Sequence, residues 1–213
     1  MDIKKTAVLI GAGEFTGFER EYTEKDLILA LDGGLLYCEE NGIMPDYIIG
    51  DFDSLPEAKQ VLLEKYPKDK ILRLPRQKDD TDMLAAIRFG MEKGITDFTM
   101  YGGLGGRVSH TIANIQCLAF LKENGLTGRL LGDHCEIRMI QNETLVLEKR
   151  DSGIISLFAF GNRAEGVCIE GLLYELDNAA LTHAFPIGVS NEFVGKEATI
   201  RVQNGTLLII VEK

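Results

Sequence analysis

The chain carries Pro-Asp-Tyr-Ile-Ile-Gly-Asp-Phe-Asp-Ser-Leu at residues 45–55. The apolar run 47–49 predicts a short buried strand that ends at the following glycine. Side chains alternate along an extended chain, so we expect Asp51 and Asp53 on one side and Phe52 turned outward between them. Two adjacent carboxylates repel each other unless a cation lies between them, and oxygen ligands in an open site suit Mg²⁺. An isolated pair of this kind would more often belong to a solvated loop.

Acidic residues also follow or precede other predicted elements. Asp32 closes the apolar run 27–31, and Lys-Asp-Asp-Thr-Asp at residues 78–82 precedes a helical pattern at 83–93. In an open α/β sheet the ends of successive strands meet at one crevice, where ligands bind. Residues 80–82 alone fit a helix N-cap whose acids complement the helix dipole. The whole set exceeds what capping requires and favours a shared metal site: Asp32, Asp51, Asp53, Asp79, Asp80 and Asp82.

Composition limits the classes of function. The chain has 213 residues, 45% hydrophobic and 26% charged, which is typical of a soluble globular protein of one large domain or of two smaller ones. The formal net charge is −10 and no long basic run occurs, which argues against nucleic-acid binding and against docking on anionic membranes. No segment has the length of a membrane span or the pattern of a signal peptide, so we expect a cytoplasmic protein.

The four cysteines are far apart and show no C-x-x-C spacing, which disfavours zinc and thioredoxin-type chemistry and indicates reduced thiols. The chain also lacks G-x-S-x-G and G-x-x-x-x-G-K-[ST], so neither acyl chemistry nor a P-loop is supported.

The two parts of the chain differ in pattern. The first alternates strands, predicted at 7–10, 27–31, 47–49, 70–74 and 98–101, with helices, predicted at 56–66, 83–93 and 111–124. This alternation predicts a mostly parallel sheet flanked by helices. From about residue 135, β-rich runs follow one another at 136–140, 144–148, 153–160, 166–170, 199–202 and 206–211. The predicted fold class is therefore α/β, with a catalytic domain at 1–134 and a smaller antiparallel β-sandwich at 135–213. Asn204-Gly205 is a strong hairpin signal between the last two strands.

Glycine-rich segments offer phosphate sites. Gly-Gly-Leu-Gly-Gly-Arg at residues 102–107 connects a strand to a helix, where glycines allow close approach and Arg107 can reach phosphate oxygens. The alternative is a flexible connection whose arginine pairs with a nearby carboxylate. Residues 11–13, Gly-Ala-Gly, fit either phosphate binding or a tight turn. His110 fits either a substrate contact or the capping of the helix start.

In this order and spacing, the motifs resemble the thiamine pyrophosphokinase family. The segments that carry the resemblance are Asp32-Gly33-Gly34, Pro45-Asp46, Gly50-Asp51-Phe52-Asp53-Ser54, Lys78-Asp79-Asp80-Thr81-Asp82, Gly106-Arg107-Val108-Ser109-His110, Ala113-Asn114, Gly171-Leu172-Leu173-Tyr174 and Ser190-Asn191-Glu192. The resemblance implies an α/β catalytic domain and a β-sandwich that helps to bind thiamine. It also implies a homodimer with sites at the subunit interface, and Mg²⁺-dependent transfer of a pyrophosphoryl group from ATP to thiamine, which releases AMP.

The resemblance also assigns residues to roles. Metal ligation falls to Asp51, Asp53 and Asp82, and the catalytic set adds Asp79 and Arg107. The ATP side comprises Asp32, Gly33, Ser54, Asp80, Thr81, Gly106 and His110, and the thiamine side comprises Tyr174, Ser190 and Asn191.

Two positions depart from the family pattern. Ser109 replaces an aspartate, so it cannot supply a charge for metal binding or alcohol activation. Tyr174 stands where animal and fungal relatives have tryptophan, and it can still stack on a thiamine ring. Two other functions remain open: a pyrophosphokinase for another small alcohol, such as a hydroxymethylpterin, and a thiamine- or nucleotide-binding module without catalysis.

Overall fold

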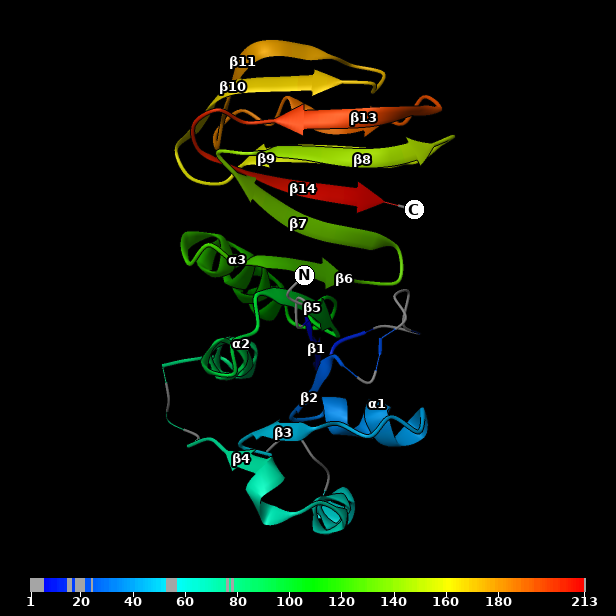
Figure 1. Cartoon of the computed structure of the whole chain (residues 1–213), viewed down its shortest axis with the longest axis vertical. Helices are drawn as coiled ribbons and strands as arrows, with labels where there is room; N and C mark the ends of the chain where they lie inside the picture. Colours follow the sequence, from blue (N-terminus) through cyan, green and yellow to red (C-terminus); the bar gives the residue numbers. More distant parts are fainter. Residues whose placement is uncertain are drawn as a thin grey trace. The chain divides into compact units, whose positions relative to one another are not determined.

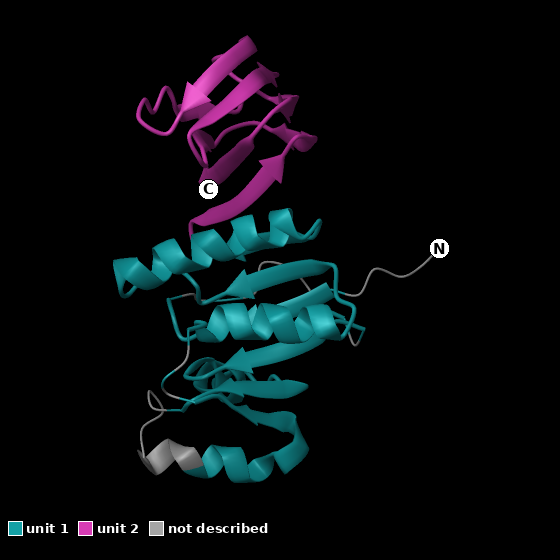
Figure 2. Ribbon diagram, turned by 90° about the vertical axis from the view of Figure 1, so that its left-hand side faces the viewer, with its two compact units in different colours: residues 1–133 teal, residues 134–213 magenta. Residues whose placement is uncertain are grey.

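The computed structural model describes residues 6–14, 17, 22–23, 25–52, 57–75, 77 and 79–212, with the backbone alone at 57–60. Asp53 and Ser54, two of the predicted site residues, lie outside the described residues. The chain divides into two compact units, residues 1–133 and 134–213, coloured separately in Figure 2.

Unit 1 is built on a parallel sheet. Its strands are β1 (Thr6–Ile10), β2 (Leu27–Leu31), β3 (Tyr47–Gly50), β4 (Ile71–Arg73), β5 (Asp97–Tyr101) and β6 (Thr127–Leu131). They lie in the order β6-β5-β1-β2-β3-β4, and every pair is parallel. Strands β1, β2 and β3 are almost wholly apolar, as expected where helices cover both faces of a sheet.

The helices of unit 1 are α1 (Gly34–Glu40), α2 (Asp82–Glu92) and α3 (Val108–Glu123). Figure 1 shows α1 on one face of the sheet and α2 and α3 on the other. The helix predicted at 56–66 is a 3-10 helix, η1 (Glu57–Lys65), followed by a short one, η2 (Lys68–Lys70). Neither α1 nor β6 was predicted, because both are short and lack strong start signals.

The order of the strands reverses at β1. The chain runs outward from β1 to β4 in one direction and then returns to place β5 on the other side of β1. Ligands bind outside the carboxyl ends of the strands at such a reversal. The loops that follow β1 and β5 are the two glycine-rich segments, 11–13 and 102–106.

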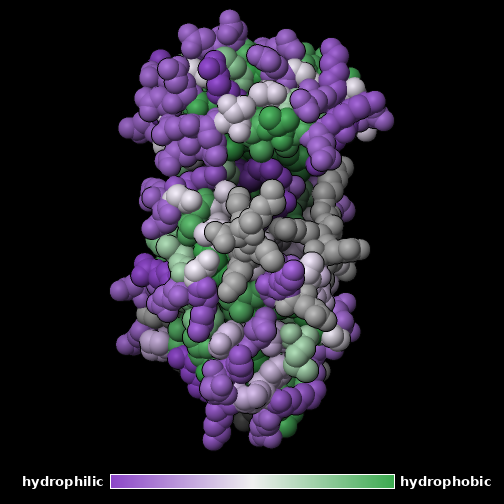
Figure 3. Space-filling model, in the orientation of Figure 1, coloured by the Kyte–Doolittle hydropathy of each residue, from purple (hydrophilic) through white to green (hydrophobic). Residues whose placement is uncertain are grey.

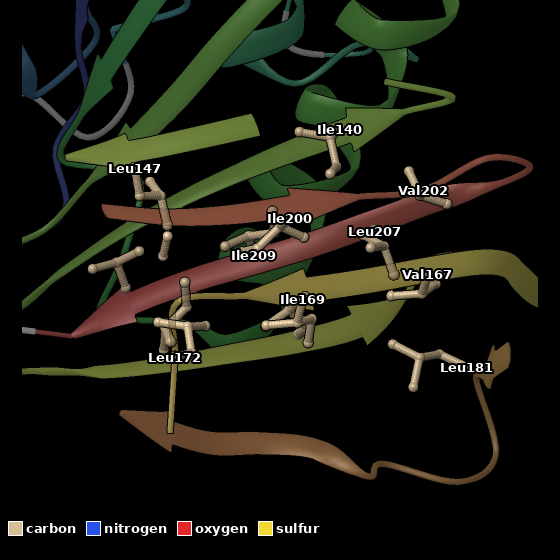
Figure 4. Close-up of a cluster of buried hydrophobic side chains, with 14 of the residues drawn as sticks. Ile140, Leu147, Val167, Ile169, Leu172, Leu181, Ile200, Val202, Leu207 and Ile209 are labelled. Carbon is tan, nitrogen blue, oxygen red and sulfur yellow. The ribbon is translucent and has the colours of Figure 1, made fainter. Parts of the chain in front are cut away.

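Unit 2 is an antiparallel sandwich. Its strands are β7 (Cys135–Gln141), β8 (Thr144–Arg150), β9 (Ile154–Ala159), β10 (Arg163–Glu170), β11 (Leu176–Thr182), β12 (Gly188–Glu192), β13 (Lys196–Arg201) and β14 (Thr206–Glu212). One sheet has the order β12-β9-β14-β7 and the other β11-β10-β13-β8. Apolar side chains from both sheets meet between them, as Figure 4 shows for Leu207 and Ile209 against Val167 and Ile200. The predicted fold class is confirmed in both units.

The predicted hairpin around Asn204-Gly205 is wrong. β13 pairs with β10 and β8, whereas β14 pairs with β7 and β9, so this turn carries the chain from one sheet to the other. The backbone of Asn204 is held instead by a bridge to Glu165, with an N–H···O distance of 2.8 Å from Glu165 N to Asn204 O. A local turn signal does not specify which strands pair.

Hydrophilic residues cover most of the surface visible in Figure 3, with apolar residues exposed between them. Within the part of the chain that the structure describes, no helix has both the length and the apolar character needed to cross a membrane.

Candidate active site

A cavity of about 550 Å³ lies at the carboxyl edge of the sheet in unit 1. It is lined by the loops after β1, β2, β3 and β5 and by the starts of α2 and α3. The structure thus brings together eight of the predicted residues: Asp32, Asp51, Asp80, Thr81, Asp82, Gly106, Arg107 and His110. Gly33 and Asp79, both described, are not among the lining residues. The chemical roles of all these residues stay predictions.

The glycines at 11–13 pack against the loop that follows β5. The N–H of Gly11 donates to Tyr101 O and that of Gly13 donates to Gly102 O, each at 2.8 Å. A Cβ on Gly11 would lie 2.7 Å from Gly102 O, and one on Gly13 would lie 2.4 Å from Leu104 O. Both N–H groups are therefore used within the backbone, which favours the tight-turn role for this segment over phosphate binding.

A buried asparagine is hydrogen-bonded to the loop at 102–106. Gly102, Gly105 and Gly106 adopt positive φ angles of 62°, 76° and 60°, which glycine adopts without strain. Asn114, only 8% exposed, donates from Nδ2 to Gly103 O at 2.7 Å and lines the cavity. Asn114 was quoted in the motif but not assigned to the site. Its spacing of four residues from His110 on one helix could have indicated a shared face.

Arg107 and His110 form a pair at the cavity wall. Arg107 precedes α3, and its Nη2 lies 2.5 Å from His110 Nε2. Because a guanidinium only donates, the imidazole nitrogen accepts here. His110 lines the cavity and orients Arg107, and Arg107 is the exposed cation at the start of the helix.

Asp32 and Asp51 come from neighbouring strand ends. Asp32 adopts a left-handed backbone, with φ of 46°, and its N–H donates to Ile49 O at 2.9 Å. A Cβ on Gly50 would lie 3.1 Å from the Cα of Asp32, so glycine at the end of β3 allows the backbones of β2 and β3 to approach each other closely. Asp51 follows directly and is half-buried in the cavity wall.

The predicted outward direction of Phe52 is wrong. Phe52 is 3% exposed, belongs to a buried cluster, and has a φ of 61°. The extended conformation ends at Gly50, so the alternation that would place Asp51 and Asp53 on one side does not continue through this residue.

The segment before α2 serves as both a cap and a cavity wall. Thr81 Oγ1 accepts from the backbone N–H of Leu84 at 3.2 Å, and it is the N-cap of the helix. Asp80 forms an ion pair with Arg88 at 3.3 Å, while Asp82 occupies the first helical turn. The capping interpretation and the cavity interpretation therefore both hold.

The donor set fits a metal that arrives with a ligand. Among the described residues, no three His, Cys, Asp or Glu side chains form a ready-made metal cluster. Mg²⁺ commonly keeps several waters and binds through one or two carboxylates together with substrate phosphates. Asp51 and Asp82, both on the wall of one cavity, meet that smaller requirement.

The predicted thiamine-side residues lie together in unit 2. Asn191, 5% exposed, accepts at Oδ1 from Tyr174 N at 2.9 Å and donates from Nδ2 to Tyr174 O at 2.7 Å. Ser190, with a φ of 59°, donates from its N–H to Ser156 Oγ at 3.1 Å. The Tyr174 side chain itself is 64% exposed, so ordinary packing inside the sandwich does not account for it.

Two family models match the chain. Residues 18–127 match the model described as thiamin pyrophosphokinase, catalytic domain, and residues 140–207 match the vitamin B1 binding domain of the same family. The first match covers the cavity residues except those of the first glycine segment, and the second covers Tyr174, Ser190 and Asn191.

Individual relatives agree with this result. Thiamine pyrophosphokinase from Bacillus subtilis is 28% identical over 198 residues, covering 92% of this chain and 91% of the relative. Thiamine pyrophosphokinase 1 from rice is 27% identical, covering 78% of this chain and 64% of the relative. The crystal structure of the Bacillus subtilis enzyme superposes with a TM-score of 0.90 at 26% identity, over 98% of this chain and 99% of that one. The chain belongs to the thiamine pyrophosphokinase family.

Proposed function

We propose that this enzyme transfers the terminal pyrophosphoryl group of ATP to the hydroxyl of thiamine, giving thiamine diphosphate and AMP, with Mg²⁺ bound beside ATP. One observation carries the proposal. A single cavity at the strand-order reversal is lined by a glycine-rich loop, an arginine and the carboxylates of Asp51 and Asp82.

The glycine-rich side of the cavity suits the triphosphate. Backbone at 102–106 presents no side chains larger than Leu104, so phosphate oxygens can approach the main chain. The start of α3 favours negative charge, and Arg107 supplies a planar set of donors next to it.

The carboxylate side suits a cation. An anionic triphosphate beside Asp51 and Asp82 would be repelled unless Mg²⁺ lay between them. When bound, Mg²⁺ would neutralise the negative charge that develops on the transferred group. Asp51 and Asp82 would hold the Mg²⁺ that accompanies the nucleotide, and Arg107 would bind phosphate oxygens directly.

The Ser109 position does not weaken this arrangement. Ser109 is exposed in the first turn of α3 and is not among the residues that line the cavity. The absence of a carboxylate at this position therefore leaves the wall that carries Asp51 and Asp82 intact. This observation favours an active enzyme over a binding module.

Unit 2 offers a surface for the thiamine ring. Tyr174 presents an exposed aromatic face, and a cationic heterocycle stacks favourably on such a ring. Asn191 fixes the loop by binding both backbone polar groups of Tyr174. Because the vitamin B1 binding domain match spans this region, we assign thiamine contact to Tyr174 and Ser190, and we assign to Asn191 the support of the loop that carries Tyr174.

A homodimer completes the proposal. Unit 2 exposes several large apolar side chains, and these would be covered in an assembly: Leu173, Phe185, Ile187 and Val189. Sedimentation of the full chain should give twice the 23.6 kDa monomer mass. A cytoplasmic location is also proposed, supported by four free thiols.

The test is a product analysis. Purified protein is incubated with ATP and Mg²⁺, with and without thiamine, and nucleotides and thiamine products are separated. AMP and thiamine diphosphate should form in equal amounts, and only when both thiamine and Mg²⁺ are present. Asp51→Asn should lower the rate at least about a hundredfold, because it removes charge that holds the metal. Asp69→Asn, at an exposed position in η2, serves as the control and should keep the rate.

Each alternative has its own outcome. AMP formation with a hydroxymethylpterin but not with thiamine would replace the acceptor and keep the chemistry. Thiamine binding without AMP formation would establish the binding module instead.

A further inference from the structure

Phe52 has an unusual combination of backbone and side chain. Its φ of 61° lies in the left-handed region, and its side chain is 3% exposed. Bulky residues rarely adopt this backbone conformation, and such strain persists only where the surrounding structure enforces it. Phe52 directly follows Asp51, which lines the cavity.

The enforcing contacts are visible around the ring. Phe52 belongs to the same buried cluster as Ile48 of β3 and Tyr66 beyond η1. The guanidinium carbon of Arg73 lies 5.0 Å from the ring centroid, a cation–π contact. Arg73 is the register partner of Gly50, so the edge strand β4 holds both the end of β3 and the ring that follows it.

A second residue that follows a neighbouring strand also has a left-handed backbone, and it can be compared with Phe52. Asp32, at the end of the neighbouring strand β2, is also left-handed, with φ of 46°. Aspartate tolerates this conformation because its short side chain can bond locally, whereas phenylalanine has no such compensation. Glycine or asparagine would relieve the strain at position 52 but would give up the buried ring.

We infer that Phe52 is a positioning residue for the Asp51 carboxylate: its buried ring holds the left-handed backbone that follows β3 and thereby fixes the direction of Asp51 into the cavity. The inference rests on the proposed role of Asp51 at the metal–nucleotide site. A loosened ring would let Asp51 rotate away, which lowers metal affinity while leaving the rest of the cavity in place.

The test compares two buried phenylalanines. Phe52→Leu replaces the ring at the strained position by a smaller aliphatic side chain. Phe98→Leu makes the same change in β5, where the side chain is 0% exposed. Binding of Mn²⁺ is followed by electron paramagnetic resonance with α,β-methylene-ATP, whose bridge between the first two phosphates cannot be cleaved. The Mg²⁺ dependence of AMP formation and the melting temperature are measured alongside.

Phe52→Leu should weaken Mn²⁺ binding and raise the half-saturating Mg²⁺ concentration by about ten- to a hundredfold. Phe98→Leu should leave both within twofold, although both variants lose thermal stability. Equal metal affinity in Phe52→Leu and the parent protein would overturn the inference, as would an equal loss in Phe98→Leu.

A second variant covers the case in which Phe52→Leu does not fold. Arg73→Met removes the cation above the ring and should weaken Mn²⁺ binding about two- to fivefold. An unchanged Mn²⁺ affinity in a folded Arg73→Met would then overturn the inference. If the parent protein itself forms no AMP, the proposed function fails. If the parent is active and Phe52→Leu keeps its metal dependence, only the role of Phe52 fails.

Discussion

The two units place functional groups by different means. Unit 1 is a parallel sheet buried on both faces, so its polar groups are confined to the strand ends, and the cavity is shaped mainly by backbone. Gly11 and Gly102 approach so closely that a side chain on either would meet the carbonyl oxygen of the other. Unit 2 is a sandwich with outward faces and loops, and it exposes Tyr174 as a side chain on a loop held by Asn191.

One device is common to both units. Asn114 in unit 1 and Asn191 in unit 2 are both buried, and each donates its amide to a backbone carbonyl at 2.7 Å. In unit 1 the asparagine supports a loop that glycines have already shaped, whereas in unit 2 it supplies several of the bonds that hold the loop. The comparison predicts that backbone changes harm unit 1 most and that amide changes harm unit 2 most.

The largest effect is expected at the glycine contact of unit 1. Gly102→Ala combines a φ of 62° with a Cβ only 2.4 Å from Gly11 O. Gly125→Ala has a similar φ of 71° but nothing within 4 Å of its Cβ. We expect Gly102→Ala to lower the free energy of unfolding by about 1–3 kcal/mol more than Gly125→Ala, because overpacking adds to the backbone strain.

Urea unfolding of the two variants measures this difference, and the Michaelis constant for ATP should rise only in Gly102→Ala. Equal losses in the two variants would mean that the close approach of the two loops adds nothing beyond the backbone conformation.

The next effect separates the two asparagines. Asn191→Ala removes bonds to the N–H and the carbonyl of Tyr174 and leaves both groups without that partner. We expect the Michaelis constant for thiamine to rise about tenfold, since unmade bonds of this kind cost about 1–3 kcal/mol. Asn114→Ala should raise the constant for ATP instead, and by less, because glycines retain the loop.

Steady-state kinetics with each substrate varied in turn checks the split. A rise in both constants for either variant would contradict the division of labour between the units.

The last effect appears only in alkaline solution and is a loss of stability that originates in unit 1. Burial raises the pKa of the Cys38 thiol to about 12 and that of Cys117 to about 11, from an ordinary value of 9. The unfolded chain releases these protons above pH 9 while the folded chain keeps them. The contribution to stability is therefore complete below pH 9 and is lost as the pH rises toward 12.

Urea midpoints between pH 8 and pH 10.5 should fall, and Cys38→Ala should fall less steeply than the parent protein. Parallel slopes in the two proteins would show that the buried thiol does not contribute to the decline.

Sequence patterns predicted the elements that are strongly apolar, and failed where a tertiary contact decides. The runs 27–31 and 206–211 were found because burial requires continuous apolar residues there. β12 was missed because Gly-Val-Ser-Asn-Glu has no alternation of apolar and polar residues. Its extended conformation is fixed by antiparallel pairing with β9. The turn at Asn204-Gly205 was assigned the wrong partners for the same reason.

In the candidate site, too, some features follow from the sequence pattern and others depend on tertiary contacts. Carboxylates at strand ends were predictable, because parallel strands bring their carboxyl ends to one edge. The direction of Phe52 was not, since a left-handed backbone depends on the cluster that receives the ring. The role of Asn114 depends on its hydrogen bond to Gly103 O, and the motif alone did not show which backbone group this side chain contacts.

The pairing of β1 with β5 has a consequence for the order of folding. Ile10 pairs with Tyr101, so the first glycine segment finds its partner only after β2, β3, β4 and α2 have been synthesised. Contacts this distant in sequence form slowly, because a long loop must close first. A nascent chain that ends before residue 101 therefore cannot form the cavity, however complete its first strands are. Substrate can stabilise this protein only late in its synthesis, when the two glycine loops have met.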